Sequence, residues 1–217
     1  MYKTVVFDLD GTLLNTLTDL ADAGNRLCRK YGWPTHERQA YRYFVGNGIP
    51  KLVERLAPAD QRTPAVLEAA LADFKRDYGQ HLRDTTAPYP GIPEMLAKLK
   101  ANGVQLAVFS NKADALAKEV VKDYFGTQYF TIVRGQMTGV APKPAAEGTN
   151  ALLQALHADP ASTLYVGDSN VYVETAHNAN LPCCGAVWGF RTREELNAAG
   201  AEYLAENSDE LYDVIMK

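Results

Sequence analysis

Cysteine and histidine are scarce in this chain. Its three cysteines are Cys28, Cys183 and Cys184, two of which are adjacent, and its four histidines stand at unrelated spacings. A disulfide framework needs several cysteines that can pair, and a zinc site needs ligands at spacings such as CxxC with a distant second pair. The sequence therefore predicts neither a disulfide-stapled fold nor a zinc site built from cysteine or histidine.

Long apolar runs and an excess of positive charge are also missing. The chain has no stretch of about 18 or more apolar residues, and its first residues, MYKTVVFDLDG, lack the apolar core and small-residue cleavage site of a secretory signal. Lysine and arginine total 22 against 26 aspartates and glutamates, a formal charge of −4, which argues against a nucleic-acid partner. We expect a cytoplasmic protein with no membrane partner, and a small anionic ligand remains open.

What is present is the composition of a folded globular protein. Of the 217 residues, 47% are hydrophobic, and the chain shows no internal repeat or low-complexity tract. A chain of this length and composition can form one domain, or one domain with a smaller insertion. Short apolar runs predict strands at 4–7, 104–109, 163–166 and 184–188, with weaker candidates at 130–133 and 202–205. Helical patterns cover 92–102, 114–124, 146–157, 170–179 and 209–217. This alternation predicts an α/β fold with a parallel sheet covered by helices.

Residues from about 16 to 87 interrupt this alternation. They contain no convincing strand, and their helical segments are broken by glycine or proline at 32–34, 46–48 and 57–58. Thr63 and Pro64 are typical of a helix start and predict a long helix toward His81. We therefore predict a sheet domain made of residues 1–15 and 88–217, with residues 16–87 inserted as a helical domain.

The strongest local motif is Asp8-Leu9-Asp10-Gly11-Thr12, which lies where the first buried strand ends. Ligands of open parallel sheets bind at the carboxyl ends of the strands, so both carboxylates are expected to project toward a site. Two neighbouring acids repel unless a cation lies between them, and carboxylate oxygens at a strand end suit Mg²⁺. The alternative is a solvated Asp-x-Asp turn.

Three more polar groups follow later strands. Ser110 and Asn111 come after the strand predicted at 104–109, Lys143 stands between two prolines, and Asp168 follows the strand predicted at 163–166. A hydroxyl and the amides at a helix start can hold phosphate oxygens, and rigid prolines reduce the entropy lost in placing one cation. The alternative for Ser110 and Asn111 is a helix cap, and that for Lys143 is an ordinary surface lysine. The alternative for Asp168 is an acidic helix N-cap.

In this order the four pieces resemble the haloacid dehalogenase superfamily of phosphohydrolases, over essentially the whole chain. The segments VGNGIPKLVERL, YPGIPEMLAKLKANG and VFSNK are most similar to its phosphoglycolate phosphatase branch. The resemblance implies a three-layer, Rossmann-like core with a small α-helical cap domain inserted after the first motif.

The resemblance also implies residue roles. Asp8 would be the nucleophile that forms an aspartyl-phosphate, and Asp10 the acid/base that protonates the leaving alkoxide and then activates water. Asp8, the backbone oxygen of Asp10 and Asp168 would bind Mg²⁺, while Lys143 would balance charge between the phosphate and Asp8. The residues implied to bind the substrate or its phosphoryl group are Gly11, Thr12, Gly46, Asn47, Ser110 and Asn111.

The chain departs from the family pattern in two places, of which the one after Asp168 matters more. Members usually carry a second acid four or five residues beyond the glycine-aspartate pair, where this chain has Val171 and Tyr172. Glu174 is about 200° around a helix from Tyr172 and is a poor substitute. Loss of such an outer partner typically costs about 10–100-fold in metal affinity or activity. Asn15, where the family often has an acid, is a milder change.

The predicted function is a Mg²⁺-dependent phosphomonoester hydrolase acting on a small phosphorylated metabolite, with 2-phosphoglycolate as the first candidate. Asp10 argues against a dehalogenase, because family members with that activity lack this acid. The alternatives are a phosphatase of a nucleotide, a sugar phosphate or pyrophosphate, a phosphomutase, and a weakly active phosphometabolite-binding module, the last because of Tyr172. The sequence leaves a monomer and a homodimer equally open.

Overall fold

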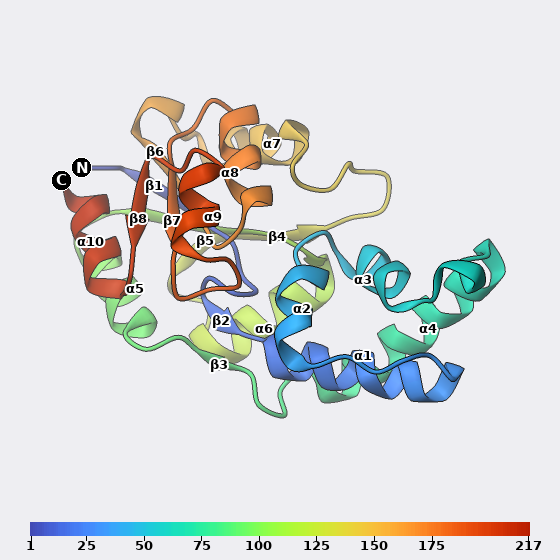
Figure 1. Cartoon of the computed structure of the whole chain (residues 1–217). Helices are drawn as coiled ribbons and strands as arrows, with labels where there is room; N and C mark the ends of the chain where they lie inside the picture. Colours follow the sequence, from blue (N-terminus) through green and yellow to red (C-terminus); the bar gives the residue numbers. More distant parts are fainter. The chain divides into compact units, whose positions relative to one another are not determined.

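The computed structural model describes all residues, Met1–Lys217, and they divide into two compact units (Figure 1). The first unit consists of Met1–Leu14 and Pro88–Lys217, and the second is Asn15–Ala87. The chain passes between the units in two short strands, β2 (Leu14–Asn15) and β3 (Ala87–Pro88), which pair with each other. Strands of two residues leave too little pattern to be predicted from sequence.

A six-stranded parallel sheet forms the centre of the first unit, in the order β5-β4-β1-β6-β7-β8. Its strands are β1 (Thr4–Phe7), β4 (Gln105–Ala113), β5 (Phe130–Gln136), β6 (Thr163–Gly167), β7 (Cys183–Ala186) and β8 (Tyr203–Ala205). The predicted α/β class is confirmed. All four residues of β1 are buried, as expected for an inner strand covered on both faces.

Several predicted strand ends were wrong, most clearly those of β4 and β7. β4 continues past Phe109 to Ala113, because its pairing with β5 resumes after a register shift at the polar residues 110–112. β7 ends at Ala186, because Gly189 N donates to Ala186 O at 3.1 Å and the chain turns there. The hydrophobic runs therefore predicted where the strands lie. The residues at which the strands end depend on backbone hydrogen bonds, which the polarity of the side chains does not reveal.

Helices cover both faces of this sheet: α7 and α8 lie on one side and α5, α6 and α10 on the other (Figure 1). The helices of the unit are α5 (Ile92–Ala101), α6 (Asp114–Phe125), α7 (Ala146–Leu156), α8 (Asn170–Asn178), α9 (Arg193–Ala198) and α10 (Ser208–Met216). On the α7 and α8 side, alternate strand residues such as Val6 and Tyr165 pack against Leu152 and Tyr172. The helix α9 was not predicted; it has only six residues and begins with a capping box between Thr192 and Glu195.

The second unit is helical, as the strand-free pattern predicts. Its helices are α1 (Leu17–Tyr31), α2 (Arg38–Phe44), α3 (Ile49–Leu56) and α4 (Pro64–His81). Gly32 ends α1 in the left-handed region at φ 67°, and Thr63 Oγ1 accepts a hydrogen bond from Val66 N at the start of α4. In neither unit is any helix long and apolar enough to cross a bilayer.

A buried carboxylate joins the two ends of the helical unit. Asp19, in the first turn of α1, accepts hydrogen bonds from both the backbone N and the Oγ1 of Thr85 and of Thr86, at 2.6–2.9 Å. These threonines directly precede β3. Since hydrogen bonds to a charged group are stronger than neutral ones, this single side chain holds the start of α1 against residues 85 and 86.

Candidate active site

The candidate site lies at the carboxyl ends of the three central strands. Asp8 follows β1, residues 110–112 lie in the last part of β4, and Asp168 follows β6. β1 lies between β4 and β6, so the chain leaves β1 toward one edge of the sheet and later returns to its other side. Such a reversal of strand order is where parallel α/β sheets bind ligands.

Asp8 and Lys143 form a buried ion pair. Lys143 Nζ lies 2.8 Å from Asp8 Oδ1, and both side chains are fully buried. The same ammonium donates to the carbonyl oxygen of Phe109 at 2.7 Å. Burial raises the pKa of Asp8 and lowers that of Lys143, and the contact between them opposes both shifts. Removing either partner would leave an unpaired charge inside the protein, which is strongly destabilising.

Asn111 holds the backbone that carries Lys143. Its Oδ1 accepts from Lys143 N at 2.9 Å, and its Nδ2 donates to Lys143 O at 3.2 Å. Ser110 is buried, and its Oγ accepts from Lys112 N at 3.1 Å. Both residues lie within β4 and not at a helix start, because α6 begins only at Asp114. The expected support from helix-start amides beside Ser110 was therefore wrong.

Asp168 is the third buried carboxylate. Its Oδ2 accepts a hydrogen bond from Phe190 N at 2.8 Å. Burial, and then the charge of Asp8, raise the pKa of Asp168 to about 7. Gly11 packs directly against it: the residue has φ +84°, and a Cβ added there would overlap Asp168 Oδ2. Glycine is required at this position for its conformation and for the space that it leaves.

Two carboxylate oxygens at the site lack hydrogen-bond partners. Asp8 Oδ2 and Asp168 Oδ1 are buried and unpaired, as are the hydroxyls of Thr12 and Ser169. Unpaired buried polar atoms are rare and need an explanation, and carboxylate oxygens are the ligands that Mg²⁺ prefers. The oxygens therefore fit the expected cation. No group of three or more His, Cys, Asp or Glu side chains is arranged to hold a metal, and the predicted set contains only two such side chains plus a backbone oxygen.

Asp10 is held by a lysine to which the sequence pattern assigned no role. Lys112 Nζ lies 3.0 Å from Asp10 Oδ1, and the two side chains are 3% and 14% exposed. Lys112 belongs to the VFSNK segment, which carries part of the family resemblance. Its ion pair with Asp10 was not predicted. A pair separated by 102 positions depends on how β4 aligns with β1.

Tyr172, at the position where the family usually has an acid, contacts Lys143. It lies in the first turn of α8, is 3% exposed, and its ring centroid is 3.9 Å from Lys143 Nζ. Burial raises the pKa of the phenol well above its usual value, so the ring is neutral. Glu174 is exposed and accepts a hydrogen bond from Asn170 at 3.2 Å, so it does not replace the missing acid.

The loop after β7 also belongs to the site and was not predicted. Trp188 Nε1 donates to Thr12 O at 3.0 Å, and Phe190 N is the donor to Asp168. A Cβ added at Gly189 would overlap Asp168 and the backbone of Gly11. The loop therefore packs the first and last motifs together, and only the glycine could have signalled a close backbone approach.

Gly46 and Asn47 lie in the helical unit, in the loop between α2 and α3. Asn47 Oδ1 accepts a hydrogen bond from Arg55 Nη2 at 2.9 Å, so the loop is held by its own unit. Gly46 has φ 110°, which favours glycine. Their role toward a substrate stays a prediction.

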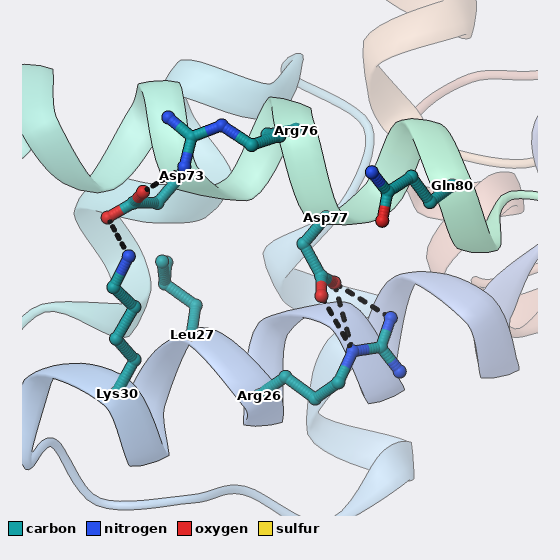
Figure 2. Close-up of a pocket in the computed structure, with 7 residues that line it drawn as sticks. All are labelled: Arg26, Leu27, Lys30, Asp73, Arg76, Asp77 and Gln80. Atoms are coloured by element: carbon teal, nitrogen blue, oxygen red, sulfur yellow. Dashed lines mark hydrogen bonds and ion pairs between the residues drawn. The ribbon is translucent and has the colours of Figure 1, made fainter.

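A cavity of about 230 Å³ lies between α1 and α4 of the helical unit (Figure 2). It is lined by Arg26, Leu27, Lys30, Asp73, Arg76, Asp77 and Gln80. Asp77 pairs with Arg26, and Asp73 pairs with both Lys30 and Arg76, at 2.7–3.0 Å. Each charged group drawn in Figure 2 is already in an ion pair and none is fully buried, so the lining serves to join two helices.

Known proteins are similar to this chain in both sequence and fold. The family profile "Haloacid dehalogenase-like hydrolase" matches residues 5–186. A phosphoglycolate phosphatase of Chromobacterium violaceum is 31% identical over 216 residues, 98% of this chain and 96% of the relative. One from Thiobacillus denitrificans is 30% identical over 191 residues, 87% and 84% of the two chains.

A solved structure is similar over the whole length. It comes from Lactobacillus delbrueckii subsp. bulgaricus, in a protein provisionally named a phosphoglycolate phosphatase, with a TM-score of 0.93, 28% identity and 99% and 98% coverage of the two chains. The resemblance seen in the motifs is confirmed. With its profile match over most of its length and its strand-end carboxylates, this chain belongs to the haloacid dehalogenase-like hydrolase family.

Proposed function

We propose that this protein hydrolyses the phosphate monoester of a small metabolite through an aspartyl-phosphate on Asp8, with 2-phosphoglycolate as the first candidate substrate. Its general activity, that of a phosphatase, follows from the family profile and from relatives of that name. One observation carries the assignment of the nucleophile: Lys143 occupies Asp8 Oδ1, while the buried Asp8 Oδ2 has no partner. One oxygen is thus held in place and the other is available for attack.

The chain's own residues account for the two half-reactions. Asp8 Oδ2 attacks phosphorus, and Asp10 gives a proton to the departing alkoxide oxygen. Asp10, now a carboxylate, takes a proton from water, and the resulting hydroxide attacks phosphorus and releases inorganic phosphate and free Asp8. Lys143 balances negative charge throughout, and Ser110 and Asn111 orient the phosphoryl oxygens.

Mg²⁺ is the proposed cofactor, held by Asp8, the backbone oxygen of Asp10 and Asp168. When bound, it would offset the negative charge shared by phosphate and carboxylate. The support is Asp168 Oδ1, a buried carboxylate oxygen without a hydrogen-bond partner at this point of the sheet. Because Tyr172 replaces an acid, the proposed site has one fewer negative group than is usual in the family.

The helical unit is proposed to act as a cap that selects the substrate. Support for 2-phosphoglycolate comes from the names of the relatives and from the VGNGIPKLVERL segment that carries Gly46 and Asn47. A nucleotide, a sugar phosphate or pyrophosphate is an alternative substrate, and a phosphomutase is an alternative reaction, because specificity depends on the cap and not on the shared motifs.

A panel of phosphate esters tests the proposal. Phosphate release is measured with and without Mg²⁺ for 2-phosphoglycolate, a nucleotide, a sugar phosphate, pyrophosphate and an aryl phosphate, using the native chain and Asp8→Asn. We expect metal-dependent turnover, highest for 2-phosphoglycolate and absent in Asp8→Asn. Fast cleavage of another ester beside negligible 2-phosphoglycolate turnover removes the first candidate, and turnover by Asp8→Asn removes the nucleophile.

Tyr172 favours a second candidate function, that of a weakly active phosphometabolite-binding protein. It would follow if no ester were cleaved at any Mg²⁺ concentration while phosphate still bound measurably in calorimetry. Asp8, Asp10, Lys143 and Asp168 are all present, which is why we propose an enzyme first.

A further inference from the structure

We infer that Tyr172 is a positioning residue of this enzyme: its ring, together with those of Phe109 and Tyr165, holds the Lys143 ammonium against Asp8. We call these three rings the aromatic cage. The inference rests on the proposed function in one respect, that Lys143 serves Asp8 during phosphoryl transfer. It assigns a purpose to the residue that otherwise counts only as a missing acid.

The cage consists of three rings from three different elements. Lys143 Nζ lies 3.9 Å from the ring centroid of Tyr172 on α8, 5.4 Å from that of Phe109 on β4 and 5.9 Å from that of Tyr165 on β6. Each ring is less than 5% exposed. A cation over an aromatic face within about 6 Å is attracted by the negative π surface, most strongly where water is excluded. The Tyr172 ring is the nearest of the three.

The remaining contacts of the ammonium explain why a ring is useful here. A lysine ammonium has three hydrogens to donate, and two partners are oxygens, Asp8 Oδ1 at 2.8 Å and Phe109 O at 2.7 Å. The face of Tyr172 supplies a third partner that carries no charge. Lys143 is thereby fully satisfied without a second carboxylate.

An acid in this place would act differently. A carboxylate at position 172 would compete with Asp8 for the ammonium, whereas a neutral ring leaves Asp8 as its ion-pair partner. Lys143 then stays on Asp8 Oδ1 and leaves Oδ2 open. The ring thus offsets the cost of burying the ammonium and directs its charge at the nucleophile.

Gly167 leaves the space in which Tyr172 packs. A Cβ added at this last residue of β6 would overlap Cβ and Cγ of Tyr172. On the same helix, the neighbouring Val173 is buried in the core shared by α7 and α8. Val173 therefore offers a matched control, since it is as buried as Tyr172 and has no ring that could attract Lys143.

The test compares Tyr172→Phe, Tyr172→Leu and Tyr172→Asp with Val173→Ala in the full-length protein. For each we measure kcat and KM on an aryl phosphate, the dissociation constant of inorganic phosphate by calorimetry, and Tm. We expect Tyr172→Phe to stay within about twofold of the native kcat and phosphate affinity, and Tyr172→Leu to lose on the order of tenfold in both. Val173→Ala should lower Tm and leave kcat unchanged.

One further variant, and the Tyr172→Asp variant, test the charge of the group at position 172. Pentafluorophenylalanine at position 172 keeps a ring of nearly the same size but reverses the charge of its face, so it should lower kcat at least as much as Tyr172→Leu, on the order of tenfold. This variant changes the electrostatics of the ring without opening a cavity. Tyr172→Asp should lower kcat, because the new carboxylate draws Lys143 away from Asp8. A rise in kcat in Tyr172→Asp, or equal kcat values for the phenylalanine, leucine and pentafluorophenylalanine variants, would overturn the inference.

The phosphate-binding measurement separates this inference from the proposed function. If the native protein cleaves no ester yet binds phosphate, and the leucine and pentafluorophenylalanine variants bind it about tenfold more weakly than Tyr172→Phe, the cage is supported while the proposed hydrolysis fails. If the native protein cleaves esters and all ring variants bind phosphate alike with equal kcat, the hydrolysis stands and the cage fails.

Discussion

Lys112 Nζ lies 3.0 Å from Asp10 Oδ1, so the proposed acid/base is held by a cation that comes from the neighbouring strand β4. Asp8 is held in the same manner by Lys143 at 2.8 Å. The two carboxylates of one short motif are thus fixed by two different lysines. Each carboxylate has its own support, and the supports can be removed one at a time.

Replacing Lys112 by methionine should affect proton transfer more than phosphate binding. Asp10 would lose its partner and its position, and a positioned general acid contributes about 10²–10⁴-fold. We expect the single-turnover rate of alcohol release from an alkyl phosphate to fall by tenfold or more, and that from an aryl phosphate, whose leaving group needs no proton, to change by about twofold. Lys118→Met, an exposed lysine paired with Asp114, is the control. Equal losses on the two substrates would contradict this assignment.

Mg²⁺ should stabilise the native protein through Asp8 and Asp168. A ligand at about 100 times its dissociation constant adds about 2.7 kcal/mol, which raises Tm by about 5–10 °C in a chain of this size. We expect this shift in calorimetric melting of the native protein and none in Asp8→Asn or Asp168→Asn. The exposed Asp213→Asn variant should respond like the native chain. A full shift in Asp168→Asn would place the cation elsewhere.

Much of the fold could be predicted because it depends on local patterns. The run TVVF that forms β1 is buried along its whole length, and the Pro93 and Thr63-Pro64 signals stand at the starts of α5 and α4. A parallel sheet covered by helices then follows from the alternation of strands and helices. The carboxyl ends of the central strands, and with them the location of the site, were accessible by the same reasoning.

The partners of the site residues were not accessible in this way. The Asp10 to Lys112 pair depends on the register of β4, and the contact of Tyr172 with Lys143 depends on which face of α8 meets the sheet. The Trp188 loop packs on Thr12 across 176 positions of sequence. Such contacts are set by tertiary packing, for which a single sequence carries no periodic signal.

Asp73 should make the stability of the helical unit depend on pH. Hydrogen bonds from Lys30, and then from Tyr31, hold the pKa of this carboxyl below its usual value. Because the pKa of Asp73 is lower in the folded state, the carboxylate adds stability at pH values above its unfolded-state pKa of about 4. This stability is lost as the pH falls through the folded-state pKa. In urea unfolding, Asp73→Asn should therefore have a lower free energy of unfolding than the native chain at pH 7. This difference should shrink as the pH approaches 3. For comparison, Glu68→Gln on the exposed side of α4 should show no comparable gap at pH 7. A gap for Asp73→Asn that stayed constant from pH 7 to pH 3 would be against this prediction.

Asp19→Asn should loosen the ends of the helical unit. The native carboxylate accepts four hydrogen bonds from Thr85 and Thr86 while almost fully buried. An amide can accept at only one of its two atoms, so at least two donors lose their partner, which should cost about 2–4 kcal/mol. Denaturant unfolding measures the loss, and amide hydrogen exchange should accelerate at Thr85 and Thr86. Asp22→Asn, on the exposed side of α1, should change stability by less than about 0.5 kcal/mol. Unchanged exchange at the two threonines would show that the carboxylate does not hold this segment.

Gly11→Ala should abolish activity with the chain still folded. The residue has φ +84°, and the added methyl group would overlap Asp168 Oδ2, so Asp168 must move away from Asp8 or the turn must change. Left-handed backbone costs a non-glycine residue about 1–2 kcal/mol, which a protein of this size can tolerate, whereas a displaced ligand removes the proposed cation site. We expect kcat to fall by more than about 100-fold and the Mg²⁺-dependent rise in Tm to disappear. Gly32→Ala is the matched control, because Gly32 also has positive φ and has open space where a Cβ would lie; it should lose similar stability and keep its activity. Native-like turnover and Mg²⁺ response in Gly11→Ala would mean that Asp168 does not need its present position.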